Sequence, residues 1–361
     1  MAWPSWLPLR DSLRPMSPYG APQVPARASL NTNENPYSPS PDLQRAITDA
    51  VAKVASQLNR YPDRDATALR TKLADYINEQ SGTRFSSENV WAANGSNEII
   101  QSIFLAFAQG PVLGFTPSYS MHPLIAKVTG SAWIDGKRNA DFSLNASDAV
   151  AEIQKYKPAL TFITTPNNPT GGAVTIEAIQ MLADAAHSVA GLLVVDEAYA
   201  EFSQELSAVT LIANNPHVIV IRTMSKAFAF AGARVGYLVS DPAVKDAMMI
   251  VRLPYHLSAL TQAAAEVAID HRTELLGGVS TLIASRATVV QALHDMGLTT
   301  IPSSANFVLF TGFKQDAPQL WAAMLEKGVL IRDVGLSGYL RVTIGNEAEN
   351  NLFISALKEL I

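Results

Sequence analysis

Short, nearly continuous apolar runs recur along the middle of the chain and alternate with segments that have the spacing of amphipathic helices. A strand covered on both faces has no polar face, so such runs predict the buried strands of a parallel sheet. The runs occupy residues 90–93, 112–115, 160–164, 192–195, 218–222 and 236–239. Helical spacing covers residues 43–58, 66–79, 99–108, 176–189 and 242–251. The alternation predicts a large α/β domain with a mostly parallel sheet.

The pattern changes near the C-terminus and again at the N-terminus. A helical stretch at 258–296 precedes short apolar runs at 306–310, 329–331 and 340–343, a helix at 317–326 and a closing helix, which predicts a smaller α+β unit. Residues 1–40 hold eight of the 21 prolines and show little periodicity. We predict an N-terminal arm (1–41) that packs on the small domain or a partner subunit, a large domain (42–265) and a small domain (266–361).

Composition narrows the class of protein. The 361 residues carry a net charge of −5 without a basic run, so neither nucleic acid nor an anionic membrane surface is a predicted partner. No segment reaches 18 uninterrupted apolar residues, and the N-terminus lacks the pattern of a signal peptide. The absence of cysteine excludes disulfides and thiolate chemistry and fits a reducing compartment. We therefore predict a cytoplasmic protein.

The most informative segment is Thr-Met-Ser-Lys-Ala-Phe-Ala-Phe-Ala-Gly-Ala-Arg at 223–234. Lys226 lies there among small and apolar residues, where poor solvation lowers the pKa of an amine and lets it form a Schiff base with a carbonyl. Thr223, Ser225 and Arg234 supply the donors that a phosphate needs. A reactive lysine next to a phosphate site suggests the cofactor pyridoxal phosphate. Taken alone, the segment 223–234 is equally consistent with a surface lysine at the end of a strand.

Polar groups at the ends of predicted strands fit the same cofactor, because ligands of open α/β sheets lie at the carboxyl ends of the strands. Asp196 ends one strand, and its carboxylate would keep the pyridine nitrogen protonated, so that the ring accepts electrons. Tyr199 and Asn168 would hydrogen-bond the ring's 3-oxygen. Taken singly, Asp196 is also consistent with a turn cap and Asn168 with an ordinary loop.

A third strand ends in Gly95-Ser96-Asn97, which opens a helix and offers backbone N–H groups to a phosphate. An ordinary helix cap explains that segment as well when it is considered alone. Tyr119 either stacks on the cofactor ring or fills the core. The six histidines lack His-x-x-x-His spacing, so we predict structural roles for them and no metal site.

Several segments in order along nearly the whole chain resemble the class I/II aminotransferases, a family of fold-type-I pyridoxal-phosphate enzymes. They are Asn-Glu-Asn-Pro at 33–36, Arg-Tyr-Pro at 60–62, Gly-Ser-Asn-Glu at 95–98, Asn-Asn-Pro-Thr-Gly at 167–171, Asp-Glu-Ala-Tyr at 196–199, Ser-Lys at 225–226 and Leu-Arg-Val-Thr-Ile-Gly at 340–345. Within the family, Ser-Pro-Tyr-Gly-Ala-Pro at 17–22 and Ile-Arg-Asp at 331–333 most resemble the histidinol-phosphate aminotransferases, in their actinobacterial form.

The resemblance implies a role for each matching residue. Lys226 would be the Schiff-base lysine, with Asp196 and Tyr199 as further catalytic groups and Tyr119 over the ring. The implied cofactor shell is Tyr61, Gly95, Ser96, Asn97, Tyr119, Asn168, Asp196, Tyr199, Thr223, Ser225, Lys226 and Arg234. The implied substrate contacts are Tyr19, Asn168, Arg332 and Arg341. Tyr61 would reach the cofactor phosphate of the partner in a homodimer with shared sites, although its spacing alone favours a packing residue.

The implied reaction transfers an amino group from histidinol phosphate to 2-oxoglutarate by a ping-pong mechanism in histidine biosynthesis. Two alternatives keep the same cofactor: an aromatic amino-acid aminotransferase, which needs no second anion-binding residue, and a phosphothreonine-type decarboxylase. The sensor half of a transcription regulator is disfavoured, because the Pro-rich N-terminus leaves no room for a helix-turn-helix domain.

Overall fold

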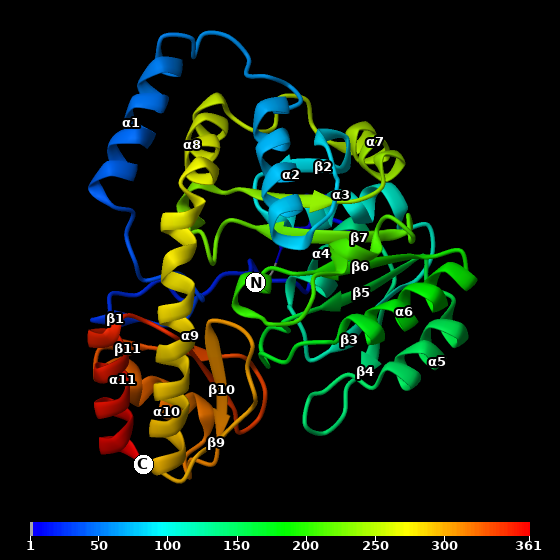
Figure 1. Ribbon diagram of the computed structural model, residues 1–361. Coiled ribbons are helices and arrows are strands. Elements are labelled where there is room, and N and C mark those ends of the chain that lie inside the picture. The colour runs from blue at the N-terminus through cyan, green and yellow to red at the C-terminus, as the bar shows by residue number, and fades with distance from the viewer. Residues whose placement is uncertain (1–2) are drawn as a thin grey trace.

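The computed structural model describes residues 3–361 and is built around a seven-stranded sheet with helices on both faces (Figure 1). The strand order is β2-β8-β7-β6-β5-β3-β4, and β8 alone runs antiparallel to its neighbours. The strands are β2 (Val90–Ala93), β3 (Val112–Thr116), β4 (Trp133–Lys137), β5 (Leu160–Thr164), β6 (Leu192–Asp196), β7 (Val218–Thr223) and β8 (Gly236–Val239). The predicted, mostly parallel α/β architecture is confirmed.

The continuous apolar runs have a direct explanation in the two hydrophobic clusters of the protein. Along β6, Leu193 and Val195 belong to one cluster, whereas Val194 between them belongs to the other. Since successive side chains of a strand point to opposite faces, both faces of the sheet are covered. The covering helices are α2 (Thr67–Ser81), α3 (Ser96–Phe107), α4 (Met121–Thr129), α5 (Ala146–Tyr156), α6 (Ile176–Ser188), α7 (Pro242–Val251) and α8 (Ala259–Asp270).

The C-terminal part forms a second sheet of order β12-β13-β10-β9, antiparallel throughout. Its strands are β9 (Thr299–Thr300), β10 (Phe307–Thr311), β12 (Arg332–Asp333) and β13 (Leu340–Thr343). The helices around it are α9 (Arg272–Asp295), α10 (Ala317–Glu326) and α11 (Glu347–Leu360). A further short strand, β11 (Val329–Leu330), pairs in parallel with β1 (Ala28–Ser29) from the N-terminal arm.

The predicted helical stretch over 258–296 is confirmed, and it consists of two helices, because the chain leaves helical geometry at His271, with φ −96° and ψ 19°, between α8 and α9. No glycine or proline marks this break in the sequence. The predicted domain boundary at 265/266 stays a prediction, and those two residues lie inside α8. By length and composition α9 is apolar enough to span a membrane, but it packs Leu275, Leu282 and Leu293 into the hydrophobic core.

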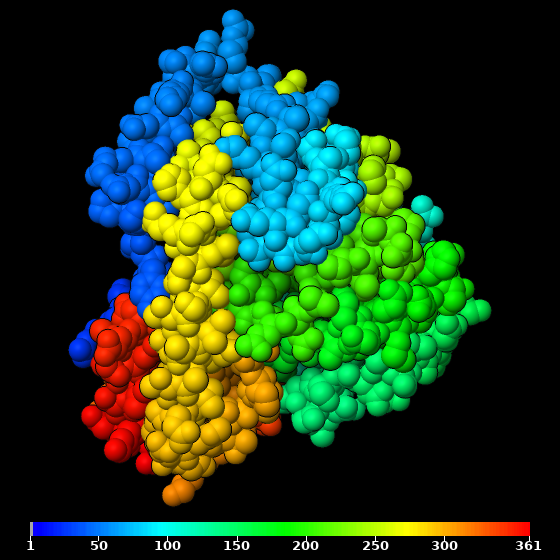
Figure 2. Space-filling view, in the orientation of Figure 1, coloured from blue at the N-terminus to red at the C-terminus, as the bar shows by residue number. Residues whose placement is uncertain are grey.

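Between the two sheets runs a segment of the arm that we call the strap, residues 30–35. Leu30 joins it to the C-terminal part: its N–H donates to the Leu330 carbonyl at 2.7 Å, and its own carbonyl accepts from the Thr343 N–H at 2.9 Å. Further along, α1 (Pro41–Ala55) packs on α8 at one edge of the molecule, and its loop to α2 forms the top of the view in Figure 2. The strap therefore carries the N-terminal chain from the small sheet to the carboxyl edge of the large one.

Candidate active site

A cavity of about 600 Å³ opens at the carboxyl ends of the parallel strands and is closed on its other side by the strap, β12 and β13. Its wall brings together residues that lie more than 300 positions apart in the sequence. Thirteen predicted site residues line it: Tyr19, Ser96, Asn97, Tyr119, Asn168, Asp196, Tyr199, Thr223, Ser225, Lys226, Arg234, Arg332 and Arg341. Gly95 lies directly behind the wall, and Tyr61 lies elsewhere on the surface.

Lys226 follows β7 and projects its amine into this cavity. The Nζ atom donates a hydrogen bond to the Thr32 carbonyl of the strap at 2.8 Å and lies 6.0 Å from the centre of the Tyr199 ring. Burial lowers the pKa of Lys226 to about 8, and the positive charges of Arg341 and Arg234 act in the same direction. Near neutral pH the neutral form of this amine is therefore far more populated than in an ordinary lysine, as a nucleophile or base requires.

Asp196 ends β6 with its side chain almost fully buried. One carboxylate oxygen accepts from the Ala198 N–H at 3.2 Å, and the other lies 3.1 Å from Nε2 of the buried His122 on α4. These partners satisfy the hydrogen-bonding needs of a carboxylate that is shielded from water. The structural role predicted for the six histidines stays a prediction. The contact between His122 and Asp196 spans 74 residues, so spacing along the sequence does not reveal it.

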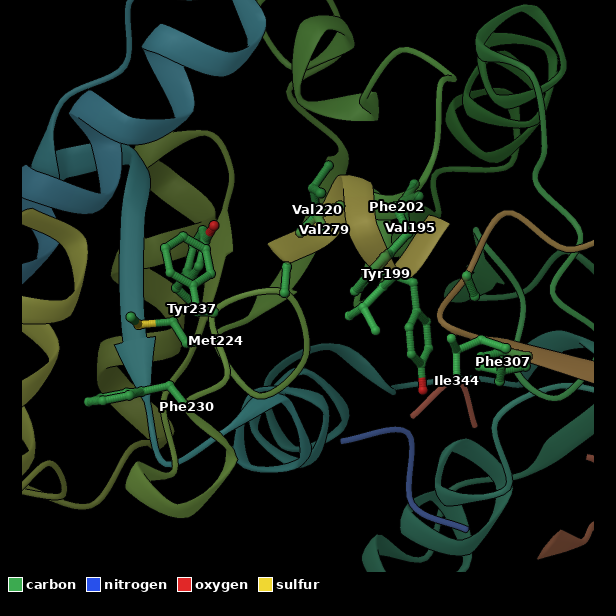
Figure 3. Packing of buried hydrophobic residues seen from close by; sticks show 14 of the residues in the cluster. Val195, Tyr199, Phe202, Val220, Met224, Phe230, Tyr237, Val279, Phe307 and Ile344 are labelled. Carbon is green, nitrogen blue, oxygen red and sulfur yellow. The ribbon is translucent and has the colours of Figure 1, made fainter. Parts of the chain in front are cut away.

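Tyr119 and Tyr199 flank the cavity from two different strand ends. The Tyr119 hydroxyl donates to Oδ1 of Asn97 at 3.2 Å, and its ring meets His122 edge-on. Tyr199 packs edge-to-face on Phe307 at 5.2 Å between centroids, with Ile344 beside it (Figure 3). Burial raises the pKa of the Tyr199 phenol, which therefore remains protonated and able to donate a hydrogen bond.

At the other end of the cavity, hydroxyl, guanidinium and backbone N–H groups converge. The Thr223 hydroxyl donates to Oγ of Ser225 at 3.0 Å, and Arg234 reaches the same oxygen at 3.5 Å. Ser96 begins α3, whose first N–H groups have no partner within the helix and whose dipole favours an anion. A Cβ at Gly95 would lie 2.5 Å from a guanidinium nitrogen of Arg234, so only glycine leaves room for this arrangement.

Two arginines from the small sheet face the cavity side by side. Arg332 on β12 and Arg341 on β13 are direct partners in the antiparallel register. Arg341 donates to Oδ1 of Asn168 at 2.5 Å and to the Asn31 carbonyl at 2.7 Å, and its Nε has no partner among residues 3–361. Burial lowers the pKa of Arg341 to about 10, and the charge of Arg332 acts in the same direction.

The end of the cavity that holds Arg332 and Arg341 is positively charged, because no acidic side chain in residues 3–361 neutralises them. Within the part of the chain that the structure describes, no carboxylate forms an ion pair with Arg332 or Arg341. Two adjacent guanidinium groups without an acidic partner form a site for a dianion, or for two carboxylates in turn. Tyr19 lies at the mouth beside them, about half exposed.

Residues 28–357 match the family model described as aminotransferase class I and II. The chain belongs to the class I and II aminotransferases. It is 54% identical over 355 residues to the histidinol-phosphate aminotransferase of Mycolicibacterium vanbaalenii, covering 97% of this chain and 95% of that one. It is 53% identical over 358 residues to the protein of the same name from Mycolicibacterium smegmatis, covering 98% of this chain and 93% of the other.

Among solved structures, this aminotransferase resembles the histidinol-phosphate aminotransferase of Sinorhizobium meliloti in complex with pyridoxal-5′-phosphate. The TM-score is 0.81 at 26% identity, over 93% of this chain and 91% of that one. The residues that line the cavity fit that cofactor: a lysine amine, a buried carboxylate held by a histidine, and a polar cradle that a Cβ at Gly95 would fill.

Tyr61 is the one predicted cofactor contact that lies apart from the cavity of this aminotransferase. It is 79% exposed and stacks on Tyr255 with 4.3 Å between ring centroids. A large, exposed aromatic pair is unusual on a free surface and typical of an interface. Its predicted contact with a partner's cofactor stays a prediction.

Proposed function

We propose that this aminotransferase transfers the amino group of histidinol phosphate to 2-oxoglutarate, in histidine biosynthesis, with pyridoxal phosphate as its cofactor. The names of relatives at 53–54% identity over nearly the whole chain support this substrate. The single structural observation that carries it is the adjacent pair Arg332 and Arg341, which no carboxylate neutralises in residues 3–361.

Each part of the cavity would hold one part of the cofactor. Ser96, Asn97, Thr223, Ser225 and Arg234 would bind its phosphate. Asp196 would bind its pyridine nitrogen, and Asn168 and Tyr199 would bind its 3-oxygen, with Tyr119 over the ring. When bound, pyridoxal phosphate supplies an aldehyde that takes up an amino group and a ring that holds the electron pair released at the substrate's α-carbon.

The protein's own groups then have separate tasks. The Nζ atom of Lys226, with its pKa lowered to about 8, would take the proton from the substrate's α-carbon and act as the acid that returns it. The Asp196 carboxylate would keep the pyridine nitrogen protonated, and His122 would fix the orientation of that carboxylate. The Tyr199 hydroxyl, which stays protonated, would donate toward the ring oxygen.

Substrate selection would depend on the two arginines and Tyr19. Histidinol phosphate carries a phosphate ester where an amino acid carries its α-carboxylate, so it presents a dianion. Two guanidinium groups and a hydroxyl match a dianion better than a single bidentate clamp does. In the second half of the reaction, 2-oxoglutarate would present its carboxylates to the same pair.

The test compares three amino donors: histidinol phosphate, phenylalanine and O-phosphothreonine. We expect the wild type to transaminate histidinol phosphate with the highest kcat/KM and to release no carbon dioxide from O-phosphothreonine. Arg332→Ala should lower kcat/KM for histidinol phosphate about tenfold to a hundredfold, because one charge-assisted bond is lost, and should affect phenylalanine little. Equal losses for both donors would favour the aromatic aminotransferase, and decarboxylation would favour the lyase.

We further propose a homodimer in the cytoplasm, with each active site completed by the partner subunit. The loop between α1 and α2 packs on the α7–α8 loop: Arg252 donates to the Arg64 carbonyl at 2.7 Å, and Tyr61 stacks on Tyr255. Together these loops and the end of α7 expose Leu58, Tyr61, Ile250 and Leu253, each more than half accessible. An apolar surface of this kind supports a two-fold contact between copies.

A further inference from the structure

Asn33 in the strap lines the cavity and has a role that the mechanism above does not use. It is buried, and its φ of 56° lies in the left-handed region, which asparagine tolerates better than most residues. The backbone carbonyl of Asn33 accepts a hydrogen bond from Nδ2 of Asn306 at 3.1 Å. A buried, hydrogen-bonded polar residue with a left-handed backbone beside a reactive centre calls for a functional explanation.

The hydroxyl of Thr343 on β13 fixes which way the Asn33 amide points. Its oxygen accepts from the Asn33 backbone N–H at 3.0 Å, and its hydrogen is donated to Oδ1 of Asn33, also at 3.0 Å. The one hydrogen of the hydroxyl is directed at Oδ1, so the amide oxygen of Asn33 lies on the Thr343 side. The amide nitrogen then lies on the opposite side.

On that side, Nδ2 of Asn33 donates to the phenolic oxygen of Tyr199 at 2.9 Å. A phenol that accepts a hydrogen bond from an amide cannot donate its own hydrogen back along the same line. The Tyr199 hydrogen must then be directed elsewhere, and Tyr199 lines the cavity. The hydrogen bonds from Thr343 to Asn33 and from Asn33 to Tyr199 thus form a chain in which each bond has one direction.

We propose that Asn33 is a positioning residue, which turns the Tyr199 hydroxyl hydrogen toward the cofactor's 3-oxygen and is itself oriented by Thr343. The inference rests on the proposed function, since it needs a cofactor oxygen in the cavity. It also assigns a task to the small sheet: β13 carries both Arg341, for the substrate, and Thr343, two residues on, for the cofactor.

The test is a pH titration of the visible absorption band of the loaded protein, with Asn33→Asp as the main variant. The added carboxylate accepts the Tyr199 hydrogen, so the cofactor's 3-oxygen loses a donor and its negative charge becomes less stable. The proton on the nitrogen that joins Lys226 to the cofactor, next to the 3-oxygen, is then held more tightly. We expect the midpoint of the titration to rise by about one to two pH units, the effect of one hydrogen bond to a charged group.

Two controls separate orientation from charge. Asn35→Asp adds the same charge two residues away, at a side chain that bonds the Ala227 carbonyl and not Tyr199. Each variant is also made in a Tyr199→Phe background. The groups that face Tyr199 and Lys226, namely Arg341, Asp196, Tyr19, Glu34 and Arg234, are unchanged throughout. We expect the shift from Asn35→Asp to be equal in both backgrounds and that from Asn33→Asp to shrink in the Phe background.

Two substitutions of Thr343 distinguish the loss of its hydroxyl from a loss of packing. Thr343→Ser keeps the hydroxyl and should titrate as the wild type does, whereas Thr343→Val should move the midpoint in the direction of Asn33→Asp. If Asn33→Asp shifts the midpoint equally in both backgrounds, the orienting role is overturned while the proposed function stands. A wild type that gains no visible band with pyridoxal phosphate would overturn both.

Discussion

The depressed pKa of Lys226 has a consequence for stability as well as for chemistry. Its pKa falls from 10.5 in the unfolded chain to about 8 in the folded protein, so between these values the unfolded state binds more protons. Stability therefore rises with pH through this window. We expect the cofactor-free wild type to gain stability relative to Lys226→Met as the pH rises from 8 toward 10.5, measured by urea unfolding of both proteins. A constant difference across the window would contradict the buried, desolvated amine.

The role assigned to the Asp196 carboxylate can be tested with two substitutions of different severity, one at Asp196 and one at His122. Asp196→Asn removes the charge that stabilises the protonated pyridine, and kcat should fall by about a hundredfold or more with the cofactor still bound. His122→Phe keeps an aromatic ring but removes one hydrogen bond to the carboxylate, which predicts a loss of about tenfold. Transaminase kinetics at saturating cofactor measure both values. Near-wild-type kcat in Asp196→Asn would contradict the assigned role.

At the scale of elements, the start of α3 ties backbone conformation to cofactor binding. Gly95→Ala places a Cβ 2.5 Å from a guanidinium nitrogen of Arg234 and strains a residue at φ 83°, at a cost of about 1–3 kcal/mol. Gly82→Ala is the matched control, because Gly82 has φ 66° and no atom within 4 Å of the added Cβ. Both variants should lose stability in thermal unfolding, but only Gly95→Ala should weaken the binding of pyridoxal phosphate. Equal affinities in the two variants would exclude Arg234 from the phosphate site.

The sequence analysis predicts correctly the elements that have a clear pattern of apolar residues along the chain. The buried strands β5 and β8 occupy the predicted residues, because a strand covered on both faces must be apolar throughout. The edge strand β4 was not predicted, since only its first two residues, Trp133 and Ile134, are apolar and Asp, Gly and Lys follow them. The helices α4 and α5 on either side of it were also missed. The break at His271 depends on tertiary packing and has no local marker.

The same distinction applies to the site. Motifs at strand ends predicted most of the cofactor-binding residues that line the cavity, because the topology of a parallel sheet brings those ends together. Tyr19 in the arm and Arg332 and Arg341 on the small sheet were predicted only from the resemblance to the family. His122 and Asn33 make their contacts across 74 and 166 residues, with partners whose position only the folded chain defines. Neither position carries a spacing signal of its own.

For the whole molecule, the decisive prediction concerns subunit exchange. Lys226→Ala and Tyr61→Ala homodimers should each be impaired, the first in chemistry and the second in cofactor affinity. A mixed dimer with shared sites contains one site with both residues intact and one with neither. We expect cofactor affinity and activity at the intact site to recover toward wild type after exchange, measured by titration with pyridoxal phosphate and by transaminase assay. No recovery despite verified exchange would mean that Tyr61 serves its own subunit.

The strap also determines when the active site can come into existence during synthesis. Strand β1 emerges from the ribosome about 300 residues before its pairing partner β11. At elongation rates of 5–20 residues per second, the interval is roughly 15 s to one minute. Until β11 and β13 have emerged, the strap lacks the hydrogen bonds to Leu330 and Thr343 that help to hold the Thr32 carbonyl against the lysine amine. A nascent chain that stops before Val329 should therefore contain a large sheet domain whose lysine is more exposed and more fully protonated than in the complete fold.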